Sequence, residues 1–68
     1  MRLHINLKEV MKERGITQTE LSAMSNVTQA KISNLCNNKM QELNIGILER
    51  IATALEIEDI SILMQFKK

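Results

Sequence analysis

Residues 17–37, TQTELSAMSNVTQAKISNLCN, decide the fold. They predict two short helices joined by a tight turn, because polar capping residues precede two apolar runs with helical spacing. Ser22 is a small residue where the helices are expected to cross, and Val27 is expected to plug the turn. Asn26 falls where the turn needs a left-handed backbone, which Asn tolerates better than most residues. The apolar residues expected to fill the wedge between the helices are Leu21, Ile32 and Leu35.

The second of these helices has an almost entirely polar outer face. Its outer positions are expected to be Thr28, Gln29, Ala30, Lys31, Ser33 and Asn34. Gln29 suits adenine, Lys31 suits guanine, and Ala30 allows close approach or contact with a thymine methyl group. The pair of helices is therefore predicted to be a helix-turn-helix that reads base edges in a DNA major groove.

Capping patterns mark the starts of further helices. Asn6 followed by Glu9, and Thr17 followed by Glu20, each predict a capping box. Behind Asn44, apolar residues recur at spacings of three and four, which predicts an amphipathic helix. The apolar positions expected in that helix are Ile45, Leu48, Ile51, Ala52 and Leu55.

The fold class expected from these patterns is all-α. A last short helix is expected from Glu58 or Asp59 onward, which makes a bundle of five short helices. Residues 3–5 and 63–66 alternate enough to form a small two-stranded ribbon, and short apolar runs leave that question open. Because no repeat or linker interrupts the sequence, residues 1–68 are expected to form a single domain.

Composition narrows the class of protein. Phe66 is the only aromatic residue, so the core must be aliphatic. Cys36 is the only cysteine and His4 the only histidine, which excludes an internal disulfide and a structural zinc site. Nothing in the sequence pairs a nucleophile with a base, so we expect no enzyme, cofactor, metal or small-molecule ligand. The chain has no membrane-spanning run and no signal-peptide pattern, which predicts a cytoplasmic protein without a membrane partner.

The charge is unevenly distributed along the chain. Residues 1–39 carry six Lys and Arg against three acidic residues, a net +3. Residues 40–68 carry three Lys and Arg against five acidic residues, a net −2. The positive part coincides with the candidate reading helix, which suits a polyanionic partner, although an ordinary surface of mixed charge would give the same numbers.

Two consecutive segments carry a family resemblance. GITQTELSAMSNVTQAKISNLCNNK resembles the DNA-binding unit of Cro and phage-repressor (XRE-type) regulators, and NIGILERIATALEIEDISIL resembles the helices that follow it. The resemblance covers roughly residues 6–64 and is similar in particular to compact members that consist of this domain alone. It implies a lambda-repressor-like fold with the helix-turn-helix at helices 2 and 3. It also implies a bacterial or phage-encoded protein that is associated with the nucleoid when bound.

The resemblance also implies roles for residues outside the reading helix. Gln18 matches a family Gln that anchors the adjacent phosphate and supports the reading helix. Asn38 and Lys39 match a Gly-Lys pair that approaches the DNA backbone. Asn26 and Asn38 stand where the family has Gly, and both keep access to positive φ. Cys36 replaces a bracing acid and is expected to pack as a small hydrophobic residue.

The partner expected is a double-stranded DNA operator. Few cations are present in one chain, so useful affinity predicts a homodimer on a palindromic operator, with half-sites about 34–36 Å apart. The candidate dimer contacts are Ile62, Met64 and Phe66, unless these residues cap the core of a monomer. The leading function is a sequence-specific transcriptional regulator, most simply a repressor. The alternatives are an antitoxin-like component that binds its own operator, or a protein–protein adaptor that kept the fold and lost DNA binding.

Overall fold

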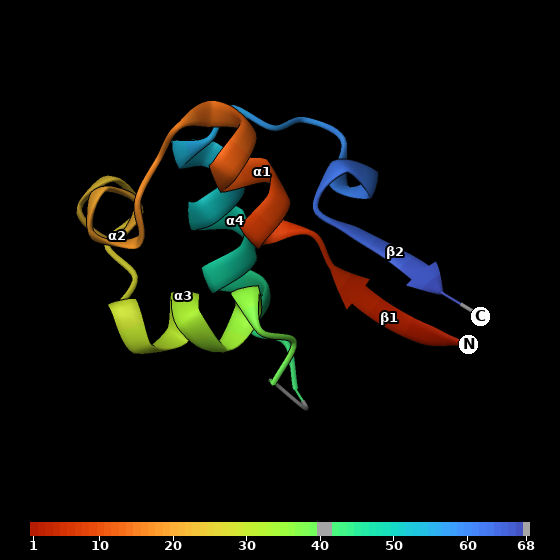
Figure 1. Ribbon diagram of the computed structural model, residues 1–68. Helices are drawn as coiled ribbons and strands as arrows, with labels where there is room; N and C mark the ends of the chain where they lie inside the picture. Colours follow the sequence, from red (N-terminus) through yellow and green to blue (C-terminus); the bar gives the residue numbers. More distant parts are fainter. Residues whose placement is uncertain (40–41, 68) are drawn as a thin grey trace.

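The structure, a computed structural model, describes residues 1–39 and 42–67 as a helical body with a small β-ribbon beside it (Figure 1). The elements in chain order are β1 (Arg2–Ile5), α1 (Leu7–Arg14), α2 (Gln18–Ser25), α3 (Gln29–Cys36), α4 (Ile45–Ala54), the 3-10 turn η1 (Ile60–Ile62) and β2 (Met64–Lys67). The two strands pair antiparallel, with Leu3 opposite Phe66 and Ile5 opposite Met64. The two ends of the chain therefore lie side by side (Figure 1).

The structure corrects the predicted fold class in two details. Within the described residues there are four α-helices, and the expected fifth helix is only the three-residue turn η1. The chain ends form the two-stranded ribbon that the sequence left open, so the fold is mainly helical and not all-α. The ribbon joins segments from opposite ends of the chain, and local spacing carries no signal for such a pairing.

The core is aliphatic, as the composition required. Leu21 and Ile32 are both 0% exposed, and Val27 is buried in the turn between α2 and α3, so the predicted wedge is confirmed. The expected apolar face of α4 is wrong at its start, where Ile45 is 72% exposed and Ile47 is only 8% exposed. The buried stripe of this helix instead runs at a spacing of four. Its members are Ile47, Ile51 and Leu55.

Each helix ends at a residue with a left-handed backbone. Gly15, Asn26, Asn38 and Glu56 have φ values of 66°, 58°, 55° and 56°. Around three of them the amide hydrogen bonds follow the pattern of a Schellman motif; after α1, for example, the N–H of Ile16 donates to the carbonyl of Met11 at 3.0 Å. These bonds satisfy carbonyls that a helix end would otherwise leave unpaired.

The two predicted capping boxes have different outcomes. At α2 the prediction is confirmed, because Thr17 Oγ1 accepts from the Glu20 N–H and the Glu20 carboxylate accepts from the Thr17 N–H, both at 3.1 Å. At α1 it is wrong, because Asn6 makes no side-chain cap bond and Glu9 lies 3.8 Å from His4 Nε2 instead. The neighbouring strand β1 supplies the competing partner for Glu9.

Three remaining expectations concern connections and special sites. The expected loop over residues 39–43 includes Met40 and Gln41, which lie outside the described residues. Across residues 1–39 and 42–67, no helix is both long and apolar enough to span a membrane. The same residues contain no group of three His, Cys, Asp or Glu side chains placed to hold a metal ion.

Candidate nucleic-acid interface

The orientation of α3 is set by its apolar side. Ile32, Leu35 and Cys36 are the buried residues of this helix, and they leave the opposite side exposed. The helix starts at Thr28, whose Oγ1 accepts a long hydrogen bond of 3.4 Å from the Lys31 N–H. A capped first turn with free amides and an exposed flank is the geometry of a DNA-reading helix.

Most residues predicted to contact DNA are exposed on or next to α3. These are Thr28, Gln29, Ala30, Lys31, Asn34, Asn38 and Lys39. Ser33 is half-buried within α3, and Gln18 is half-buried at the first position of α2. Residues 28–39 therefore form one continuous candidate surface, whereas Gln18 comes from the preceding helix, which packs against α3.

The turn between α2 and α3 sets how far α3 projects. Asn26 ends α2 with its N–H donating to the Ser22 carbonyl at 3.0 Å. The Ser22 hydroxyl then reaches across the turn and donates to the carbonyl of Val27 at 2.6 Å. Ser22 is thus more than a small residue at the crossing, because its hydroxyl bonds the two sides of the turn together.

Asn37 is a residue of this surface that sequence analysis missed. It is exposed, and its Nδ2 donates to the Ser33 carbonyl at 3.0 Å and lies 3.4 Å from the Ser33 hydroxyl oxygen. At helical spacing, Ala30, Asn34 and Asn37 fall on the side directly opposite the buried stripe. That spacing of four and three was the available signal, but Asn37 was assigned only to the end of the helix.

The electrostatics of the surface are simple. Lys31 is the only charged residue of Gln29–Cys36, and Lys39 follows directly after the helix end. Residues 21–41 contain no Asp or Glu at all. Polar side chains and two lysines without a nearby acid in sequence suit a phosphate-lined groove, although the total charge is low.

Cys36 lies on the buried side of α3 and packs as a small hydrophobic residue, as expected. Its Sγ is 3.7 Å from Met11 Sδ, and the residue is buried. Burial raises the pKa of the Cys36 thiol; the charge of Lys8 opposes this rise and that of Glu9 adds to it. The thiol is therefore kept protonated and away from the DNA-facing side.

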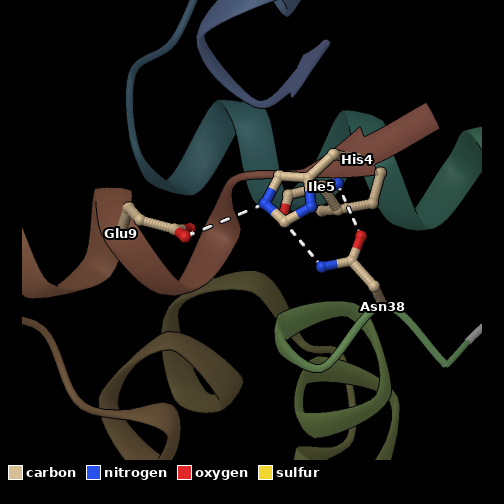
Figure 2. Close-up of polar contacts among 4 residues, drawn as sticks. All are labelled: His4, Ile5, Glu9 and Asn38. Atoms are coloured by element: carbon tan, nitrogen blue, oxygen red, sulfur yellow. Dashed lines mark hydrogen bonds and ion pairs between the residues drawn. The ribbon is translucent and has the colours of Figure 1, made fainter. Parts of the chain in front are cut away.

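Asn38 has an unexpected partner. Its side-chain amide bonds both backbone groups of Ile5 in β1, as Figure 2 shows. The residue that the resemblance assigned to the DNA backbone therefore has its amide turned toward the N-terminal strand.

The candidate dimer contacts lie on and next to the ribbon. Directly paired and alternate residues of a sheet share a face, so Leu3, Ile5, Met64 and Phe66 lie on one side of it. Ile5 is buried and Met64 half-buried against the core, whereas Leu3 and Phe66 continue this apolar face into solvent. Ile62 and Phe66 are thus exposed as predicted, and Met64 serves partly as core.

The fold and this surface define a helix-turn-helix DNA-binding domain. The profile of the Cro/C1-type HTH DNA-binding domain matches residues 6–67, and the chain belongs to that family. Among individual proteins, the chain is 35% identical over 58 residues to YozG of Bacillus subtilis (strain 168), an uncharacterized HTH-type transcriptional regulator; the match covers 85% of this chain and 69% of the relative. No solved structure matches the chain. The family predicted from residues 17–37 is confirmed.

Proposed function

We propose that this DNA-binding regulator reads sequence in the major groove with α3 and represses transcription by occluding a promoter. The observation that carries the proposal is the side of α3 opposite Ile32 and Leu35, which is exposed, polar and free of acidic residues. A helix with these properties fits the width of the major groove and can bond to base edges.

The side chains divide by chemistry into base and phosphate contacts. Gln29 and Lys31 carry the donors and acceptors that distinguish adenine and guanine, and Ala30 permits close approach. Asn34 and Ser33 extend the same surface by one turn. The groups suited to phosphate are Gln18, Thr28, Asn37 and Lys39.

The low charge of one chain favours a homodimer on a palindromic operator. The apolar side of the ribbon offers a surface for a second copy, formed by Phe66 with Leu3 beside it and Ile62 next to it. A two-fold dimer of this kind places two α3 helices in successive major grooves, about 34–36 Å apart. The proposed setting is the cytoplasm of a bacterium or of a phage-infected cell, and an antitoxin role would use the same operator contacts.

A second candidate is a protein–protein adaptor that retains the fold. It is favoured by one observation, the single charge on α3, because phosphate contacts supply most of the non-specific affinity for DNA. The two candidates differ in whether affinity for DNA depends on the outer side chains of α3.

Selection of randomised duplexes by the purified protein at low salt tests the proposal. We expect an inverted repeat to be enriched, and the logarithm of its affinity to fall linearly with the logarithm of salt concentration. Gln29→Ala should relax preference at one base position by about 1–3 kcal/mol. Lys31→Ala should weaken binding about tenfold, whereas Lys12→Ala, a matched change of an exposed lysine on α1, should change it less than about threefold.

The opposite outcomes favour the adaptor. These are no enriched sequence with a flat salt response, or an operator affinity that neither Lys31→Ala nor Gln29→Ala changes. In either case α3 is not the reading helix.

A further inference from the structure

The segment after α3 is tied to the N-terminal strand by one side chain. Asn38 Oδ1 accepts a hydrogen bond of 2.7 Å from the Ile5 N–H, and Asn38 Nδ2 donates one of 3.3 Å to the Ile5 carbonyl (Figure 2). A primary amide carries the same donor and acceptor as a peptide group. Asn38 therefore pairs with β1 as a single residue of a third strand would.

The edge of β1 that Asn38 occupies is the one facing away from β2. On the other edge, the Asn6 N–H donates to the Leu63 carbonyl at 2.6 Å. Because backbone groups of successive residues in an antiparallel strand point to opposite edges, those of Ile5 face away from β2. Ile5 is only 6% exposed, so its peptide groups need a partner from the protein.

The backbone of Asn38 has a separate task, which is to end α3. Its φ is 55°, its N–H donates to the Leu35 carbonyl at 3.2 Å, and the Lys39 N–H donates to the Asn34 carbonyl at 2.9 Å. A glycine would adopt this left-handed conformation with less strain. The side chain of Asn38 adds what a glycine lacks, a tether between the helix end and β1.

The strand that receives this tether is itself held in place. The Ile5 side chain is part of the core, and β1 is paired with β2 over residues 2–5. The His4 imidazole lies 3.8 Å from the Glu9 carboxylate of α1, which ties the strand to the helical body a second time. The segment that carries Lys39 is thus fastened to a fixed element.

We propose that Asn38 is a positioning residue of the DNA interface, which holds the Lys39 segment so that its ammonium group meets a phosphate next to α3. The inference rests on the proposed function, since it takes α3 as the reading helix. Without the tether the segment samples other arrangements, and affinity falls with the fraction of chains in the competent one.

Asn38→Gly is the informative variant, because it keeps the left-handed backbone and removes only the tether. Asn26→Gly is its matched control, because Asn26 has φ 58° and its side chain makes no hydrogen bond to any other described residue. We expect Asn38→Gly to weaken binding to the selected operator about tenfold, the loss expected for about two hydrogen bonds. The control should stay within about twofold of the unmodified protein.

The salt dependence separates positioning from a general loss of stability. Lys39→Ala should lower the slope of log affinity against log salt by about 0.9, the value for one phosphate contact. Asn38→Gly should lower the slope by a similar amount although it removes no charge. In the Lys39→Ala background, Asn38→Gly should then have little further effect. An unchanged slope, or two effects that add fully, would overturn the inference.

Amide hydrogen exchange of the free protein tests the tether without DNA. The Ile5 N–H should be protected in the unmodified protein, should exchange at least about tenfold faster in Asn38→Gly, and should be unaffected by Asn26→Gly. An unprotected Ile5 N–H in the unmodified protein would show that the tether does not form.

The two proposals fail in different ways. Operator binding that is insensitive to Lys31→Ala and Gln29→Ala overturns the reading role of α3, and this inference with it. Binding that needs Lys31 and Gln29 but keeps its salt slope in Asn38→Gly overturns the positioning role of Asn38 alone.

Discussion

The Ser22 hydroxyl donates a 2.6 Å hydrogen bond to the carbonyl of Val27, and this bond crosses the turn of the helix-turn-helix. Ser22 lies in α2, and Val27 is the buried residue of the turn just before the cap of α3. The bond therefore links the orientation of α3 to the body of α2. A polar side chain at this crossing does work that its small size alone does not explain.

Ser22→Ala should lower the free energy of unfolding by about 1–2 kcal/mol, because the Val27 carbonyl loses its partner in a partly buried place. Alanine is the better helix former, which offsets a few tenths of this loss. Thr19→Ala, an exposed change in the same helix, should be neutral or slightly stabilising and serves as the control. Urea unfolding measures both, and equal stability of the two variants would contradict the role of the bond.

The two predicted capping boxes supply a second comparison. Thr17→Ala should cost about 1 kcal/mol of stability, because it removes the acceptor for the Glu20 N–H. Asn6→Ala should cost less than about half as much, because Asn6 makes no side-chain cap bond. Thermal or urea unfolding of the two variants tests this order. A larger loss for Asn6→Ala would mean that its side chain has a stabilising contact in solution.

The buried thiol makes stability depend on alkaline pH. Because burial raises the pKa of Cys36 in the folded state, the protonated thiol contributes stability below the unfolded pKa, about 8.5, and this is lost as pH rises through the folded pKa. The free energy of unfolding should therefore fall more between about pH 8 and pH 10 in the unmodified protein than in Cys36→Ala. Urea unfolding at both pH values gives the comparison. Parallel pH profiles would show that the thiol titrates alike in both states.

The proposed dimer surface can be tested by oligomeric state. Phe66 is 68% exposed and Ile62 44% exposed, and replacing either by Ser should raise the dimer dissociation constant about tenfold or more, since each removes apolar area from the contact. Ile45→Ser is the matched control, because Ile45 is equally exposed but lies on α4. Sedimentation equilibrium measures all three. A protein that is monomeric at every concentration, or loses its dimer in Ile45→Ser, would place the interface elsewhere.

Most of the helix-turn-helix could be predicted from the sequence because its determinants are local. The cap at Thr17, the left-handed turn at Asn26 and the apolar spacing of Leu21, Ile32 and Leu35 all lie within residues 17–37, and the structure confirms each. A helix start or stop depends on residues three or four positions away, so a short stretch of sequence contains the whole signal. The polar outer side of α3 follows from the same spacing.

The phase of α4 shows where local patterns become ambiguous. Ile45, Ile47 and Leu48 are all apolar, so several faces of the helix fit a spacing of three and four. Packing against α2 and the rest of the core buries Ile47 and exposes Ile45. The choice between apolar neighbours is made by the surface that the helix meets, which the sequence of the helix does not contain.

By itself, then, the sequence determined the helix-turn-helix, its family and the polar side of α3 that carries the candidate site. Only the tertiary structure decided that the chain ends pair as β1 and β2, and that Asn38 is tethered to Ile5. Both features join segments that are far apart in the chain and are stabilised by backbone hydrogen bonds, which any residue can make. Such bonds leave almost no mark on residue type or spacing, so they become visible only when the folded chain brings the partners together.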